Sequence, residues 1–288
     1  MTSEELSDTS IKKDMKTKAF FILAIALLSF SEAFSQGNEA KVLSAYKNGI
    51  KRFMTFETCG SPVDGPVYVY KETENHFLDR LMPITQQQQD EIGLRQFQNS
   101  MESHVANRPR DLQKIKEIVG KLVAQSRFPD RQYHVYLIQS NEINAFSTIG
   151  GYIYVTTALF DYVDSDDELA FVLGHELTHI INQHVVRKIK KMAMLAYAGQ
   201  RLNMQQFQKI ALNLNLTLSA PFDQIDEYDA DRGAITLVEK AGYDKTAFNG
   251  LFQKFEKLEK KQLLSRFTST HPTSAHRKAC LNKMIGNK

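Results

Sequence analysis

The amino-acid sequence predicts an α+β fold that is mainly helical and contains one small antiparallel sheet. Apolar residues recur at helical spacing in several long segments, and short runs rich in aromatic and β-branched residues lie between them. The chain has 288 residues, of which 42% are hydrophobic and 24% charged, so it can bury a globular core. A formal net charge of +3 without any nucleic-acid-binding motif argues against nucleic acid as a partner.

The first 35 residues are typical of a secretory signal peptide. Lys16 and Lys18 precede an apolar run at 19–30, and Ala33-Phe34-Ser35 offers a cleavage site. Met15 could be the true start of the protein. The apolar run is short for a membrane span, which takes roughly 20 residues. We therefore expect an exported, periplasmic protein, with an uncleaved N-terminal membrane anchor as the alternative.

Residues 36–83 form an N-terminal extension whose role the sequence does not indicate. The run Cys59-Gly-Ser-Pro-Val-Asp-Gly-Pro66 is rich in turn residues. Cys59 and Cys280 are the two cysteines of the chain. Export would permit a disulfide between them, but spacing alone does not show that they lie close together.

The segment that follows supplies two helices and the strands. Residues 85–105 are expected to form an exposed helix, and 111–126 an amphipathic one. Tyr133–Ile138 alternates as a strand does. Gly150-Gly151 marks a turn or bulge before Tyr152–Thr156, a run of aromatic and β-branched residues. This strand could be an edge that pairs with an extended substrate backbone, or part of a core hairpin.

Residues 165–190 carry the strongest functional pattern. Ser165 and Glu168 form a capping box at the start of an apolar helix. His175 and His179 are four residues apart, so both imidazoles lie on one helix face and can bind one ion. Glu176 lies beside them, and H-E-x-x-H on a helix is typical of zinc proteases, in which the glutamate is the general base. The alternative is a pair of partly buried histidines with local hydrogen bonds.

A second helix, at 223–240, carries Glu227 and Asp231 on one face. Glu227 could complete a His₂Glu zinc set, and Asp231 could accept the free ring N–H of a ligand histidine. The alternative is a solvated acidic face. Between the two helices, residues 191–220 could form a helix and a lid over a cleft, or a patch that touches a membrane. A further helix is expected at 248–264, and a short helix ends the chain.

Taken together, these motifs resemble peptidase family M48, a family of zinc metallopeptidases. The resemblance covers 84–288 and rests on five motifs in order: Asn144-Ala-Phe with Gly150-Gly-Tyr-Ile-Tyr-Val155, His175-Glu-Leu-Thr-His179, Glu227-Tyr-Asp-Ala-Asp231, Ala241-Gly-Tyr-Asp244 and His271-Pro-x-x-x-x-Arg277. It implies that 84–288 form a zincin-type metalloprotease domain of the small, single-domain periplasmic type.

The resemblance also implies roles for individual residues. One Zn²⁺ would be bound by His175, His179 and Glu227, with Glu176 as the general base, Asp231 behind a ligand histidine, and His271 or Arg277 as a second donor to the oxyanion. The expected substrate-binding residues are those of the sheet edge bordering the cleft: Asn144, Gly151, Tyr152, Ile153 and Tyr154.

The expected substrates are polypeptides, chiefly misfolded or unassembled envelope proteins. His271 could also bind the zinc and silence the enzyme. A non-catalytic zinc-containing chaperone or assembly factor is the alternative function, and a hydrolase of small substrates is a weaker one. Peripheral contact with a membrane or an envelope protein is a further expectation.

Overall fold

The computed structural model describes residues 75–76, 78–80, 82–196, 203–213, 224–260 and 274–286. The chain divides into two compact units, Met1–Leu81 and Met82–Lys288, and the elements named below belong to the second. The predictions for the signal peptide, most of the N-terminal extension, Cys59 and His271 lie outside the described residues. Among the described helices, none combines the length and the apolar character that a membrane span requires.

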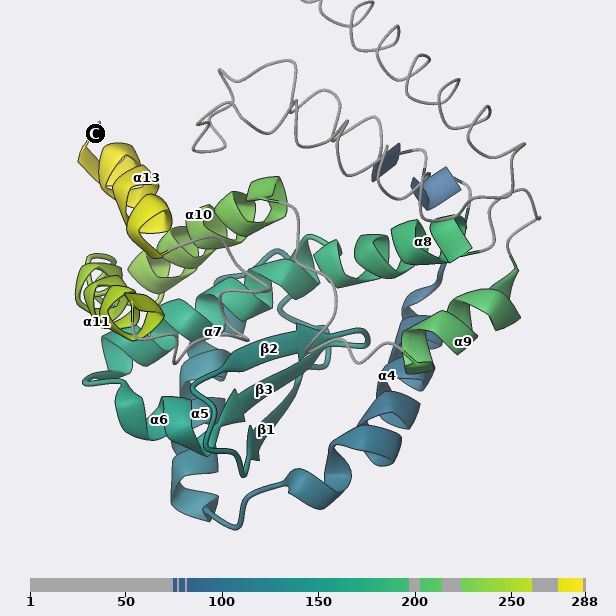
Figure 1. The fold of residues 1–288 in the computed structure, drawn as a ribbon, viewed down its shortest axis with the longest axis horizontal. Coiled ribbons are helices and arrows are strands. Elements are labelled where there is room, and N and C mark those ends of the chain that lie inside the picture. Colours follow the sequence, from purple (N-terminus) through teal and green to yellow (C-terminus); the bar gives the residue numbers. More distant parts are fainter. Residues whose placement is uncertain are drawn as a thin grey trace, which may run out of the picture. The chain divides into compact units, whose positions relative to one another are not determined.

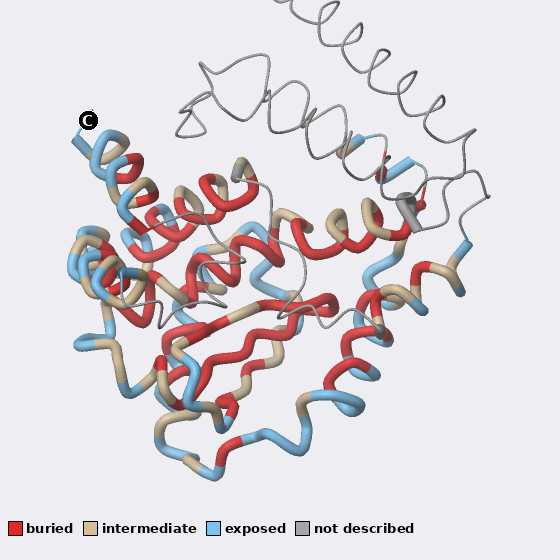
Figure 2. The backbone as a smooth tube through the Cα atoms, viewed as in Figure 1, coloured by how far each residue is buried: buried red, intermediate tan, exposed pale blue. Residues whose placement is uncertain are grey.

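The second unit is built around helix α7 (Asp166–Ile181), which is buried along almost its whole length (Figures 1 and 2). The Ser165 hydroxyl accepts from the Glu168 N–H at 3.2 Å, as the cap predicted. The Glu168 carboxylate, however, accepts from the N–H of Asp164 at 2.8 Å, one residue before the expected position. Acidic residues in the first turn also favour the helix, because they face its positive dipole end.

The predicted helix 165–190 is interrupted. α7 ends at Ile181 with Asn182 as its C-cap residue, and α8 (His184–Ala196) begins after Gln183, whose φ of 60° is left-handed. Neither glycine nor proline marks this position, so no local sequence signal predicts the break. The side chain of Asn182 donates to Asp229 at 2.6 Å, and this contact with another helix holds the junction. Because of this break, the His184 side chain lies against His179 of α7.

The sheet has three strands, β1 (His134–Ile138), β2 (Ala145–Thr148) and β3 (Tyr152–Thr156), in the order β1-β3-β2. β2 pairs with β3 antiparallel, through the turn at Gly150-Gly151, whereas β1 pairs with β3 parallel. The sheet is therefore mixed, not antiparallel as expected. Since β3 is bonded on both sides and fully buried, the prediction that Tyr152–Thr156 forms an edge is wrong. Among the described strands, β1 and β2 are the edges.

The remaining helices cover α7 and the sheet (Figure 1). α5 (Pro109–Ala124), α10 (Gln224–Lys240) and α11 (Phe248–Lys260) pack against α7, and α13 (Ser274–Gly286) packs against α10 and α11. The apolar residues of these elements and of one sheet face form a single core.

A second, smaller apolar cluster joins α8 to α4 (Gln86–Ser100) and α9 (Met204–Asn213). Its largest buried members are Ile92, Ile189 and Phe207. The predicted helix 85–105 is shorter than expected: α4 ends at Ser100, and the short 3₁₀ helix η1 (Glu102–His104) follows it. The described part of 191–220 is thus helical and packed.

α7 and α10 make the most extensive helix–helix contact of the described chain. Glycine allows their backbones to approach closely. A Cβ at Gly174 would lie 3.2 Å from Cα of Ala234, and one at Gly233 would lie 2.9 Å from Cβ of Thr178. The close approach matters for the site, because His175 and Glu227 lie on these two helices.

Candidate metal centre

Two imidazole nitrogens meet on the buried face of α7. His175 is 4% exposed and His179 is fully buried, and their Nε2 atoms lie 3.0 Å apart. The one-turn spacing that the sequence predicted brings this about. Two ring nitrogens that face each other away from water need a shared proton or a cation between them, because their lone pairs otherwise repel.

Glu227 of α10 closes the third side. Its carboxylate is fully buried, with one oxygen 3.6 Å from Nε2 of His175 and the other 3.4 Å from Nε2 of His179. The three residues offer ligand atoms that all lie within 4.8 Å of one another. A buried carboxylate between two imidazoles has the donor types and the charge that a divalent cation such as zinc requires. This chain therefore has a set of residues that fits a metal ion.

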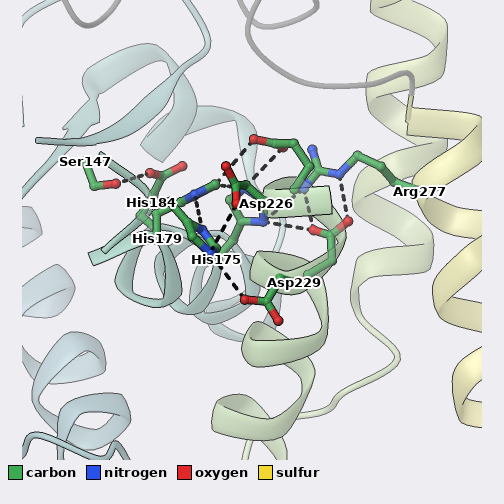
Figure 3. Close-up of polar contacts among 10 residues, drawn as sticks. Ser147, His175, His179, His184, Asp226, Asp229 and Arg277 are labelled. Atoms are coloured by element: carbon green, nitrogen blue, oxygen red, sulfur yellow. Dashed lines mark hydrogen bonds and ion pairs between the residues drawn. The ribbon is translucent and has the colours of Figure 1, made fainter. Parts of the chain in front are cut away.

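A buried ion pair between Asp231 and Arg277 adjoins His175, and Figure 3 labels the arginine and the histidine. Nδ1 of His175 is 2.9 Å from Oδ1 of Asp231, and Arg277 donates from Nε to Oδ2 of Asp231 at 2.9 Å and from Nη2 to Oδ1 at 2.5 Å. Burial and the nearby Arg277 charge lower the pKa of His175 to about 3, so its imidazole is neutral. Nδ1 then carries the proton for Asp231 and leaves the Nε2 lone pair for a metal.

Arg277 is 2% exposed, and its guanidinium carbon lies 4.8 Å from the Phe252 ring centroid. Burial alone would raise the pKa of Asp231, but the charge and hydrogen bonds of Arg277 outweigh it and lower that pKa. This position does not favour the expected role of Arg277 as an oxyanion donor, because its Nε and Nη2 donate to the two carboxylate oxygens of Asp231. Nη2 of Arg277 also lies 3.1 Å from Nδ1 of His175, so Arg277 contacts this imidazole directly as well as through Asp231.

His179 has a different outer partner, His184, the first residue of α8. The Nδ1 atoms of the two rings lie 3.0 Å apart, and Nε2 of His184 is 3.3 Å from Asp229 and 3.6 Å from Asp226 (Figure 3). Burial would raise the pKa of Asp229, but its hydrogen bond with His184 and other contacts lower it to about 2. If His179 keeps its Nε2 lone pair for a metal, its Nδ1–H donates to His184, whose Nε2–H then faces the Asp229 carboxylate.

Glu176 is 3% exposed, and burial raises its pKa to about 7. Ser147 of β2 donates its hydroxyl to Oε2 of Glu176 at 2.9 Å. A carboxyl group with a pKa near neutrality can both take and give a proton at physiological pH. Ser147 thus fixes the orientation of the candidate base, and β2 is the strand that borders the site.

Sequence reasoning missed Ser147 and the contacts of His184. Ser147 lies three residues after Asn144, within the span of the first family motif. The one local signal for its position was that Ala145 and Ser147, two residues apart, lie on the same face of a strand. The contact of His184 depends on the left-handed Gln183, which no pattern indicated.

The residues expected to bind substrate lie elsewhere in the sheet. Asn144 bonds through its backbone to Thr156, with its N–H 3.1 Å from Oγ1 and its carbonyl 3.0 Å from the Thr156 N–H. The Gly151 carbonyl accepts from the N–H of His134 at 2.9 Å. Tyr152, Ile153 and Tyr154 belong to the central strand. Backbone pairing of a substrate with these three is therefore excluded, and among the strands that the structure describes the edge near Glu176 is β2.

A model of "Peptidase family M48" matches residues 109–285. The "Beta-barrel assembly-enhancing protease" of Escherichia coli (strain K12) is 29% identical over 208 residues, which are 67% of this chain and 42% of that protein. The Yersinia pestis protein of the same name is 32% identical over 49% of this chain and 32% of its own length.

The "Mitochondrial metalloendopeptidase OMA1" of Arabidopsis thaliana is 31% identical over 55% of this chain and 33% of its own length. The chain thus spans roughly a third to two fifths of the length of these three curated relatives. The family match covers more than half of the chain and includes all residues of the candidate centre, so this protein belongs to peptidase family M48.

Proposed function

We propose that this protein is a zinc-dependent metalloendopeptidase that cleaves unfolded or unassembled polypeptides of the cell envelope. The observation that carries the proposal is the meeting of His175, His179 and Glu227 directly beside Glu176. The names of the curated relatives support proteolysis, and "beta-barrel assembly-enhancing" supports envelope proteins as substrates. The N-terminal signal-like segment supports export.

His175, His179 and Glu227 would hold the zinc. When bound, such an ion lowers the pKa of a water molecule and polarises a carbonyl group. Glu176 takes a proton from the attacking water and gives it to the leaving amine. Water is thereby added across the peptide bond, with hydroxyl on the carbonyl carbon and hydrogen on the nitrogen. Ser147 keeps the Glu176 carboxylate aimed during both transfers.

The outer contacts orient both imidazoles. Asp231 and Arg277 hold His175, and His184 holds His179 with the help of Asp229. Mutation of such partners usually weakens metal affinity by about 10–100-fold. An extended substrate would lie along β2, where an open strand edge offers main-chain hydrogen bonds and only loose sequence preference.

The test compares wild type with Glu176→Gln, using zinc analysis and digestion of an unfolded outer-membrane β-barrel protein. We expect both proteins to bind one zinc ion and only wild type to cleave. Glu117→Gln is the matched control, because it makes the same chemical change on an exposed helix face. Full cleavage by Glu176→Gln would refute the assignment, whereas zinc binding without cleavage by wild type would favour the non-catalytic chaperone.

A further inference from the structure

Tyr228 directly follows the ligand candidate Glu227 on α10, and α13 packs beside this helix (Figure 1). The centroid of the Tyr228 ring is 5.6 Å from that of His276, which precedes Arg277 on α13. Arg277 donates to Asp231, which lies one turn after Tyr228 on α10. The tyrosine ring therefore lies between α10 and α13, close to the ion pair that adjoins the metal centre.

The hydroxyl group of Tyr228 is buried and has no hydrogen-bond partner among the residues that the structure describes. Tyr228 as a whole is 3% exposed. Roughly nine tenths or more of the buried polar groups in proteins do have a partner. A buried hydroxyl that is left over next to a metal-ligand candidate therefore points to an acceptor that reaches it from another molecule.

We propose that the Tyr228 hydroxyl donates a hydrogen bond to the carbonyl oxygen of the peptide bond that is cleaved. The inference rests on the proposed peptidase function and assigns a further catalytic residue to it. When water adds to the carbonyl carbon, the electron pair of the C=O π bond moves to the oxygen, which becomes negatively charged and needs a donor. When the carbon–nitrogen bond breaks, that pair returns to the C=O bond, and the leaving nitrogen takes the proton that Glu176 removed from the water.

The charges around Tyr228 suit a neutral donor. Burial and the negative charges of Asp231 and Glu227 outweigh the positive charge of Arg277 and raise the pKa of Tyr228 to about 12. The hydroxyl therefore keeps its own proton at neutral pH and gives only a hydrogen bond. Arg277, which the sequence suggested for this role, already donates to both oxygens of Asp231. Tyrosine is one of the side chains that stabilise an oxyanion in enzymes.

The variant Tyr228→Phe removes the hydroxyl and keeps the ring. Since the hydroxyl has no partner among the described residues, and a buried polar group without a partner destabilises a fold, the thermal midpoint should equal or exceed that of wild type. Tyr154→Phe is the matched control. It makes the same change at a fully buried tyrosine of the central strand, in the separate apolar cluster that contains Phe97 of α4.

The first measurement is kcat and KM, determined separately, on a peptide from an unfolded protein that wild type cleaves. We expect Tyr228→Phe to lower kcat by about 10²–10³-fold, the usual effect of losing one oxyanion donor, with KM nearly unchanged. Tyr154→Phe should keep the wild-type kcat. Unchanged kcat in Tyr228→Phe, or equal losses in the two variants, would overturn the proposal. A loss of kcat accompanied by a lower thermal midpoint would show a structural role instead.

The second measurement needs no catalysis. Calorimetry on the zinc-loaded full chain compares two inhibitors with the same dipeptide side chains. One is a phosphoramidate, whose phosphoryl oxygens mimic the tetrahedral carbon, and the other is a thiol, which offers sulfur and no oxygen at that position.

Tyr228→Phe should weaken binding of the phosphoramidate by about 10–100-fold, the effect of one hydrogen bond to a charged acceptor, and leave binding of the thiol unchanged. Weaker binding of both compounds, or of neither, would refute the role of Tyr228. If the selective loss is found but wild type cleaves no peptide, only the peptidase assignment fails. If wild type and Tyr228→Phe cleave equally well, the peptidase stands and the donor is refuted. Failure of wild type to bind either compound would refute both.

Discussion

Replacement of Gly233 by alanine should force α7 and α10 apart and weaken the metal centre. A methyl group at this position would overlap Cγ2 of Thr178 and lie 2.5 Å from its Oγ1 and 2.9 Å from its Cβ. Thr178 cannot move away easily, because it is β-branched, 3% exposed and donates its hydroxyl to the Gly174 carbonyl at 2.7 Å. The clash must therefore be relieved by movement of a helix.

The expected magnitude follows from opposing effects. Overpacking of a core costs about 1–3 kcal/mol, and loss of the Thr178 hydrogen bond adds about 0.5–1.5 kcal/mol. Alanine in place of a helical glycine returns about 0.5–1 kcal/mol. We therefore expect the free energy of unfolding to fall by about 0.5–4 kcal/mol.

The assay is urea denaturation of the full chain in the presence of a chelator, followed by zinc affinity from competition with a chromophoric chelator. Glu227 lies on the same helix as Gly233, so we expect weaker zinc binding as well as lower stability. Adding Thr178→Ala to Gly233→Ala removes the two colliding atoms Cγ2 and Oγ1, so the double variant should recover part of the lost stability and zinc affinity. This recovery is measured by a double-mutant cycle.

Gly120→Ala is the control, because a methyl group there meets nothing within 4 Å. It should raise stability by about 0.5–1 kcal/mol. The reasoning is refuted if Gly233→Ala is as stable as wild type, or if Thr178→Ala restores nothing in the double variant.

Three further predictions concern the ion and its outer partners. Arg277→Lys should weaken zinc binding by about 10–100-fold, because an ammonium cannot grip both Asp231 oxygens; unchanged affinity in a zinc titration would contradict this. His184→Gln should also lower zinc affinity by about 10–100-fold, while His104→Gln, an exposed histidine, should not; equal affinities would show that His184 does not position His179. Chelation of zinc should lower the thermal midpoint of wild type, since an ion at 100 times its Kd contributes about 2.7 kcal/mol. The midpoint of Glu227→Gln should respond far less, and an equal response would place the ion elsewhere.

The local sequence determined the parts of the protein that depend on one helix. Ser165 predicted where α7 begins, and the four-residue spacing of His175 and His179 predicted that their rings would meet. Glu227 could be nominated from its spacing to Asp231, and it does lie beside both imidazoles. These inferences succeed because helix geometry is set by neighbouring residues, so spacing along the chain fixes direction in space.

Only the tertiary structure decided what lies around the three ligand candidates. Strand order depends on pairing between distant segments, so the sequence could not show that β3 is central and β2 faces Glu176. Arg277 is 46 residues from Asp231 in the sequence, and only the folded structure shows that its guanidinium donates to that carboxylate. The physical reason is that long-range packing selects partners by shape and burial, and neither property is written in local spacing.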